Sequence, residues 1–173
     1  MKRIFIIFFL IFCFSCSFKD KEQFSTDICI DGFFSKKHRN YITTEEDQLS
    51  LENISYQAEI NNFKFDAKCI FSNNKYIANL SILFVVQPVN AKTTNIVMPY
   101  YIALLDSQNN ILDIQYYKVK GSLNNNEEKT FFIETEIIDN QSIIFKYKDK
   151  EIFQKNKIMI GFMLNKEKLK IVN

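Results

Sequence analysis

Few side chains in this sequence have the types and spacing that chemistry needs. The 173 residues include four cysteines and one histidine, His38. Beyond residue 16, no Cys-x-x-Cys pair is present to complete a zinc site with that histidine. The sequence also lacks a Gly-x-Ser-x-Gly nucleophile elbow, a glycine-rich phosphate loop and a His-Glu-x-x-His metal motif. We therefore predict that the protein is not an enzyme and that it binds no metal or cofactor.

Two carboxylates could still act together. Glu134 and Glu136 lie two residues apart in an alternating segment, so they share one face of a strand and could converge on a substrate. The alternative is a solvated outer face, paired with Lys118 or Lys120 on a neighbouring strand. We favour this structural alternative.

Tyrosines form a second group with a possible binding role. They could make an exposed aromatic ledge for a glycan or a protein, because each ring joins an apolar body to a polar hydroxyl. The alternative is that most of them lie in the core or in strand pairs, which we favour. The residues are Tyr100, Tyr101, Tyr116 and Tyr117.

The first fifteen residues carry the clearest pattern. Lys2 and Arg3 precede an unbroken apolar run of 11 residues from Ile4 to Phe14, and small residues follow at Ser15 and Cys16. This order of basic, apolar and small residues is typical of a secretory signal peptide. The apolar run is shorter than the roughly 20 residues that a membrane-spanning helix needs. We predict that residues 1–15 are a signal peptide that is removed.

Cys16 is the predicted lipidation site. It resembles the acceptor of a bacterial lipobox, in which Ser15 fits the preceding position while Cys13 and Phe14 depart from the usual residues. Ordinary signal peptidase cleavage at the same bond is the alternative. A diacylglycerol on the Cys16 sulfur and a third acyl chain, such as palmitate, on its amine would hold the protein to a membrane, because two or more chains anchor firmly. Ser17 in place of an aspartate favours the outer membrane over the inner one.

The remaining cysteines are predicted to pair. Removal of residues 1–15 leaves Cys16, Cys29 and Cys69. If Cys16 carries lipid, one pair remains in an oxidising compartment, so we predict a Cys29–Cys69 disulfide. Cys69 also falls on the inward face of an alternating segment, as a core disulfide requires. The alternative is two separate buried thiols that act as small apolar side chains.

Charge argues against a nucleic-acid partner. Lys2 and Arg3 carry the whole net charge of +2, since the other 20 basic residues equal the 20 acidic ones. A nucleic-acid-binding protein usually has a basic surface. The run Lys36-Lys37-His38-Arg39 could contact anionic headgroups near the anchor, although a solvated loop is the favoured reading.

The rest of the chain predicts one β domain. We expect a lipidated N-terminus and tether over 16–28 and an all-β domain over 29–173. About seven strands with short turns and no amphipathic helix are typical of an antiparallel β-sandwich, here with an immunoglobulin-like topology. A hairpin turn is expected at Ser72–Lys75, a kink at Asn61-Asn62 and a β-bulge near Tyr116; residues 139–157 have no clear assignment, and one helical turn is expected at 165–170. The expected strands are 53–60, 63–71, 76–87, 99–105, 111–119, 130–138 and 158–164.

Several of these segments resemble a known group of proteins. Tyr56–Ile60, Pro99–Asp106 and Gly161–Leu164, together with Cys29 and Cys69, resemble uncharacterised lipoproteins of alphaproteobacteria. The resemblance implies a lipidated Cys16 and a periplasmic β domain, with no activity attached.

The expected function follows from the anchor and the missing motifs. We expect an envelope lipoprotein that serves as a non-enzymatic binding or structural module, with the membrane and an envelope protein as partners and no nucleic acid. The alternative is a soluble secreted or periplasmic protein that binds a small ligand, or an enzyme with an unrecognised site.

Overall fold

One sheet is organised around its longest strand, β6. In the computed structural model the described residues are 25–44, 53–89, 95–122 and 134–172. β6 pairs with β9 along one edge and with β4 and β5 along the other, all antiparallel. Beyond these, β3 pairs with β4 and β1 pairs with β5. The six strands are β1 (Ser25–Asp27), β3 (Asn40–Thr44), β4 (Ile54–Phe65), β5 (Cys69–Ser72), β6 (Lys75–Pro88) and β9 (Thr135–Lys146).

β4 and β5 form one interrupted strand along β6. The register shifts between Ile60 and Asn62, so the predicted kink is a bulge inside β4. The break comes later, at residues 66–68. The predicted hairpin turn is confirmed: Asn73 and Asn74 both have positive φ, 48° and 58°, as a two-residue type I′ turn requires.

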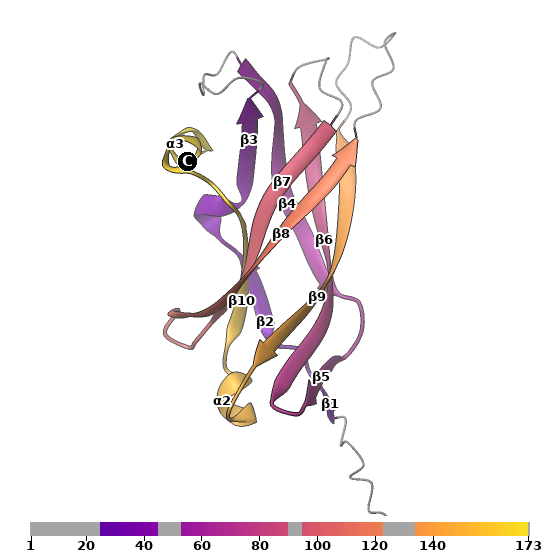
Figure 1. The fold of residues 1–173 in the computed structure, drawn as a ribbon, viewed down its shortest axis with the longest axis vertical. Helices are drawn as coiled ribbons and strands as arrows, with labels where there is room; N and C mark the ends of the chain where they lie inside the picture. Colours follow the sequence, from indigo (N-terminus) through magenta and orange to yellow (C-terminus); the bar gives the residue numbers. More distant parts are fainter. Residues whose placement is uncertain (1–24, 45–52, 90–94, 123–133, 173) are drawn as a thin grey trace, which may run out of the picture.

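The second sheet has four strands in the order β2-β10-β7-β8. Three of its strands pair antiparallel, but β10 runs parallel to β2. The prediction of a wholly antiparallel sandwich is therefore wrong at this pair. Both strands start at the same end of the molecule, β2 just after β1 and β10 just after a short helix, so they run in the same direction (Figure 1). The strands are β2 (Asp31–Phe34), β7 (Asn95–Leu105), β8 (Ile111–Ser122) and β10 (Lys157–Phe162).

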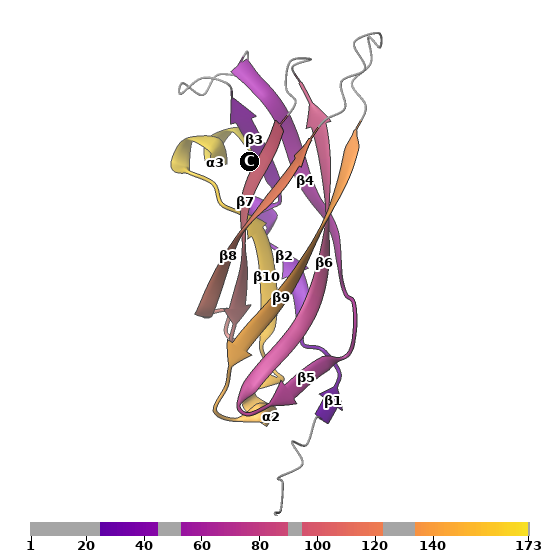
Figure 2. The ribbon, with the colours of Figure 1, turned by 45° about the vertical axis from the view of Figure 1, so that its right-hand side comes forward.

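The two sheets pack face to face, as two views show (Figures 1 and 2), and aromatic side chains lie in the core between them. Phe84 of β6 lies between Tyr100 of β7 and Phe162 of β10, with ring centroids 5.2 and 5.7 Å apart. All three side chains are fully buried. Burial of each such ring stabilises the fold by roughly 2–3 kcal/mol. The predicted all-β fold of packed sheets is confirmed.

The described ranges contain ten strands rather than about seven. The seven expected strands overlap β4 through β10, but 53–60 and the start of 63–71 both fall in β4, and residues 130–133 of the expected strand 130–138 lie outside the described residues. The additional strands, β1, β2 and β3, lie in the N-terminal part of the domain. They were not predicted because polar residues interrupt the apolar alternation there. β1 falls inside the predicted tether 16–28, so the β domain begins before residue 29.

The bulge in β8 is not where the sequence suggested. The register shift lies between Asp113 and Ile111, opposite Leu104 and Leu105, so the extra residue is Leu112 and pairing around Tyr116 is regular. A bulge leaves its extra residue unpaired and turns the strand. As a result, Ile111 and Leu112 are both exposed.

Helical structure is limited to short segments. α2 (Lys150–Phe153) is capped by the Asp149 carboxylate, which accepts from the Ile152 amide at 3.0 Å. α3 (Lys166–Val172) fulfils the helical turn expected near 165–170, and η2 (Lys36–His38) is one 3₁₀ turn. Within the described ranges, no helix is long and apolar enough to cross a bilayer.

The two ends of the molecule carry different elements. β1, β5 and α2 lie together at one end of the long axis, which we call the basal end (Figure 1). α3 and η2 contact each other and lie away from it, as both ribbon views show (Figures 1 and 2).

Candidate functional site

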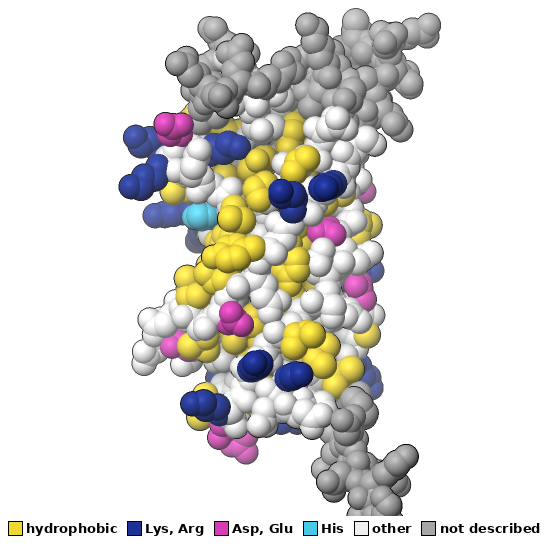
Figure 3. Space-filling view, in the orientation of Figure 1, with side chains coloured by type: hydrophobic (Ala, Val, Ile, Leu, Met, Phe, Trp, Pro, Cys, Tyr) yellow, Lys and Arg dark blue, Asp and Glu magenta, His cyan; other side chains and the backbone are white. Residues whose placement is uncertain are grey.

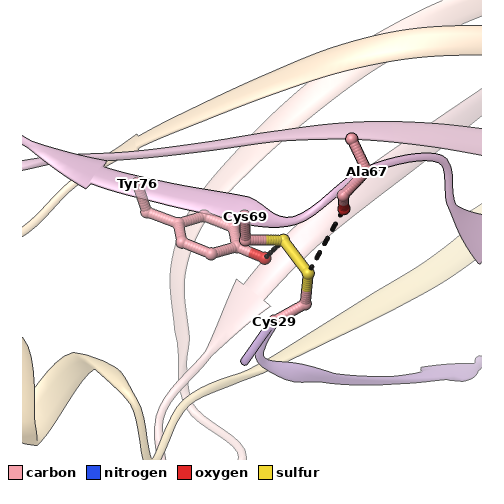
Figure 4. Close-up of a disulfide and its surroundings, with 4 residues drawn as sticks. All are labelled: Cys29, Ala67, Cys69 and Tyr76. Carbon is pink, nitrogen blue, oxygen red and sulfur yellow. Dashed lines mark hydrogen bonds between the residues drawn. A yellow bond between two sulfur atoms is a disulfide. The ribbon is translucent and has the colours of Figure 1, made fainter. Parts of the chain in front are cut away.

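Of the predicted site residues, the two paired cysteines are brought together. Cys29 and Cys69 form a disulfide with Cα atoms 5.1 Å apart (Figure 4). Cys29 lies where the chain passes from β1, in one sheet, to β2, in the other, and Cys69 begins β5. The predicted lipidation site, Cys16, lies outside the described residues, so lipidation stays a prediction.

The disulfide is held in a buried polar contact. The Tyr76 hydroxyl donates to the Cys69 sulfur at 3.0 Å. Burial raises the pKa of this tyrosine, although the backbone amide of Ile30 opposes that shift. The Cys29 sulfur lies 3.9 Å from the Ala67 carbonyl oxygen, a contact without donation because a disulfide sulfur has no proton. These contacts describe a structural disulfide.

The acidic pair does not form a site. Glu134 and Glu136 are both exposed. β9 pairs with β6 rather than with β8, so Glu136 lies opposite Val85. The pairing with Lys118 or Lys120, which are on β8, is therefore wrong. No group of three His, Cys, Asp or Glu side chains in the described part of the chain could hold a metal ion.

The four tyrosines separate instead of forming a ledge. Tyr100 is fully buried and stacks on Tyr117 with centroids 5.3 Å apart. Tyr101 is half-buried, and only Tyr116, at 64% exposed, faces solvent. The favoured alternative, core and strand-pair positions, therefore holds for most of them.

Tyr100 belongs to a polar bridge between the two sheets. Its hydroxyl donates to the Asp139 carboxylate on β9 at 2.7 Å, and the Gln141 amide donates to the same carboxylate at 3.1 Å. Burial, reinforced by Asp139, raises the pKa of Tyr100 well above its ordinary range. Nearby, the Gln115 amide of β8 donates to the Ile144 carbonyl of β9 at 2.7 Å. The Gln115 contact joins β8, an edge of the four-stranded sheet, to the edge strand β9 of the other sheet, and Tyr100 adds a contact to β9 from β7.

The basic run is partly structural. The Arg39 guanidinium forms an ion pair with Glu59 at 2.8 Å, donates to the Ile60 carbonyl at 3.2 Å and stacks 5.2 Å from the Phe34 ring centroid. His38 contacts the Phe162 carbonyl through Nδ1 at 3.0 Å. The run lies away from the basal end, from which the chain enters the domain.

The outer face of the four-stranded sheet is unusually apolar. One row across it consists of Phe33, Met159, Ala103 and Ile114, which are aligned by strand register on β2, β10, β7 and β8. The next row pairs Tyr101 with the exposed Tyr116. Hydrophobic side chains run in a band over the front of the molecule, where this sheet lies (Figure 3). We call this surface the apolar face.

A glycine shapes the apolar face. A Cβ atom on Gly161 would lie 2.7 Å from the Tyr101 hydroxyl oxygen and 2.8 Å from the His38 Cβ. Only glycine therefore lets these two side chains lie across β10. The ring of Tyr101 and that of His38 meet edge to face, 5.7 Å apart.

Neither protein-family models, nor curated proteins, nor solved structures gave a match to this chain. The resemblance to alphaproteobacterial lipoproteins therefore stays a prediction.

Proposed function

We propose that this protein is a lipid-anchored, non-enzymatic binding module of a bacterial envelope. Acyl chains on Cys16 hold it to the periplasmic side of a membrane, with the outer membrane favoured by Ser17. The basis for the anchor is the N-terminal pattern of basic, apolar and small residues. A disulfide between the other two cysteines fits an oxidising compartment. An immunoglobulin-like relationship, supported by two packed sheets with a chain that crosses between them early, belongs to the same proposal.

The apolar face is the observation that carries the binding role. In a sheet with one face in the core, the other face usually alternates to polar residues. Here β7 instead has apolar residues on that face: Val97 is exposed and Pro99 and Tyr101 are half-buried, while Ala103 and Leu105 further along the strand are buried. Apolar side chains that extend over neighbouring strands mark an interaction surface, and a protein partner in the envelope fits them best.

Site-specific photocrosslinking in living cells tests the binding role. A photoreactive residue replaces Tyr116 on the apolar face or, as a control, Ile138 on the outer side of β9. Both native side chains are 64% exposed, so the positions differ in sheet and not in access. We expect a discrete protein adduct from position 116 and none from position 138. Equal adducts at both positions, or none at either, would contradict the proposal.

Intact mass tests the anchor separately. Protein extracted from membranes should have the mass of residues 16–173 plus three acyl chains. The Cys16→Ala variant should lose the acyl mass and leave the membrane fraction. An unmodified mature chain would remove the anchor from the proposal and leave the apolar face to be tested by crosslinking.

A further inference from the structure

A second exposed surface lies where the two sheets separate toward the basal end. Leu112 of β8, Ile144 of β9 and Ile152 of α2 line a groove of about 570 Å³ there. These side chains are 53%, 47% and 64% exposed. Their exposure has local causes: the β8 bulge turns Leu112 outward, and Ile144 follows the alternation of β9 away from the core. Aliphatic side chains are thus presented to solvent beside α2.

Lysines lie beside these aliphatic side chains, and two of them face each other across neighbouring strands. Lys146 and Lys148 line the groove. Strand register places Lys75 directly opposite Lys146, and like charges in that position destabilise a sheet. An anionic surface would relieve this repulsion. The groove also holds Asp113 and Asp149.

Both groove carboxylates are already engaged. Asp149 accepts from the Ile152 amide at 3.0 Å, and Asp113 accepts from the Ile114 amide at 2.8 Å. Both carboxylates are nevertheless exposed, and a hydrogen bond from an amide does not cancel their charge; the exposed Lys75, Lys146 and Lys148 outnumber them by one.

The path of the chain places this surface near the membrane. β1 lies at the basal end (Figure 1), and the nine residues from Cys16 to Ser25 can span at most about 30 Å. β6 extends away from that end for 14 residues, a length of about 45 Å. An anchor on Cys16 therefore keeps the basal end within about 30 Å of the bilayer, so that the basal surface can reach it.

We propose that the basal groove docks on an anionic phospholipid surface. Leu112, Ile144 and Ile152 enter the interfacial region, and the lysines meet lipid phosphates. Docking orients the domain with the apolar face to the side, free for a partner. This inference rests on the proposed anchor for its biological setting, but the contact itself needs no acyl chain.

Vesicle sedimentation of the mature chain with Cys16→Ser, which carries no lipid, tests the contact. One vesicle is pure phosphatidylcholine, and the other contains about one part in three of phosphatidylglycerol. We expect the protein to bind the vesicle that contains phosphatidylglycerol. Added salt should weaken this binding, because it screens the attraction between the lysines and the anionic lipids. Equal binding to both vesicles, or to neither, would overturn the proposal.

Matched variants locate the contact. Lys146→Gln with Lys148→Gln should weaken binding about 25-fold, from roughly fivefold per lysine. Lys166→Gln with Lys170→Gln, the same charge change on α3, should weaken it less than about threefold. Equal losses would show that net charge and not the basal groove decides binding, which overturns the proposal.

Two substitutions of exposed isoleucines test the apolar part of the contact. Ile144→Thr should weaken binding several-fold, whereas Ile138→Thr, on the same strand and further from the basal end, should not. The β-branched threonine keeps strand propensity, and thermal unfolding checks that each variant folds. Equal binding by the two variants would contradict insertion at the groove.

The failure of docking and the failure of the anchor are distinguishable. If membrane-extracted protein carries acyl chains but the Cys16→Ser chain binds no vesicle, the anchor stands and docking is wrong. If the Cys16→Ser chain binds as expected but extracted protein is not acylated, docking stands and the anchor is wrong.

Discussion

Removal of the disulfide should be the most damaging change that leaves every strand intact. Cys29→Ala with Cys69→Ala opens a loop whose ends are 40 residues apart in sequence. On the chain-entropy estimate, the closed loop restricts the unfolded chain by about 4 kcal/mol. Loss of the buried Cys69 sulfur adds up to about 1 kcal/mol. The Tyr76 hydroxyl still accepts from the Ile30 amide but loses the sulfur as the acceptor of its own proton.

Urea unfolding measures the effect. With a slope of about 2 kcal/mol per molar, a loss of 4–5 kcal/mol should move the midpoint down by about 2 M. Wild type under reducing conditions should approach the double variant, while the Cys16→Ser control should unfold as the oxidised wild type does. A loss below about 1 kcal/mol would refute the reasoning, since the loop would then contribute little.

Three smaller changes test the interior and the hairpin turn. Tyr100→Phe should lower the free energy of unfolding, measured by urea titration, by about 1–3 kcal/mol, because the half-buried Asp139 carboxylate loses a donor. The control Tyr117→Phe, which removes a hydroxyl that donates to Gln115, should lower the free energy of unfolding by less. Burial raises the pKa of Tyr56 from 10.0 to about 12, so its stabilisation is present below pH 10 and lost as pH rises toward 12; unfolding of Tyr56→Phe should depend less steeply on pH over that window. Asn74→Gly should raise the melting temperature, because φ is 58° at this turn position.

Strands with strict alternation could be read from the sequence. β6 shows this best, since Leu80, Ile82 and Phe84 are fully buried and the hairpin turn before it has the residues that positive φ requires. The lower half of β9 was missed for a physical reason. Asp139 and Gln141 point inward within the alternation, where the Asp139 carboxylate accepts from both Tyr100 and Gln141. Because these inward residues are polar, the segment did not show the apolar alternation that predicts a strand.

Pairing between distant segments could not be predicted. The parallel contact of β2 with β10 joins residues more than 120 positions apart, and the spacing within each strand carries no information about it. The β8 bulge was misplaced because both faces of that strand contain aromatic or aliphatic residues, so alternation did not identify the extra residue.

Some features of the candidate sites could be predicted from the sequence, and others depend on the pairing of distant strands. Cysteine parity predicted the Cys29–Cys69 bond, since the three cysteines expected after removal of residues 1–15 leave one pair if Cys16 carries the predicted lipid. The lysine pair of the basal groove was not foreseeable, because Lys75 meets Lys146 only through the register of two strands. The nearly continuous apolar run of β7 could have indicated the apolar face. We used that run only to predict a strand, and not to predict an exposed apolar surface.

The position of the disulfide also decides how the domain would carry mechanical load. Tension on the N-terminal side of the chain reaches β1 first, and its three residues form a short ladder with β5. The next fixed point is Cys29, where the covalent bond passes the force directly to Cys69 and so into the β5–β6 hairpin. The closed loop between the two cysteines, which contains β2, β3 and β4, then bears no tension. A domain pulled by its tether would therefore lose β1 while its two sheets stay together.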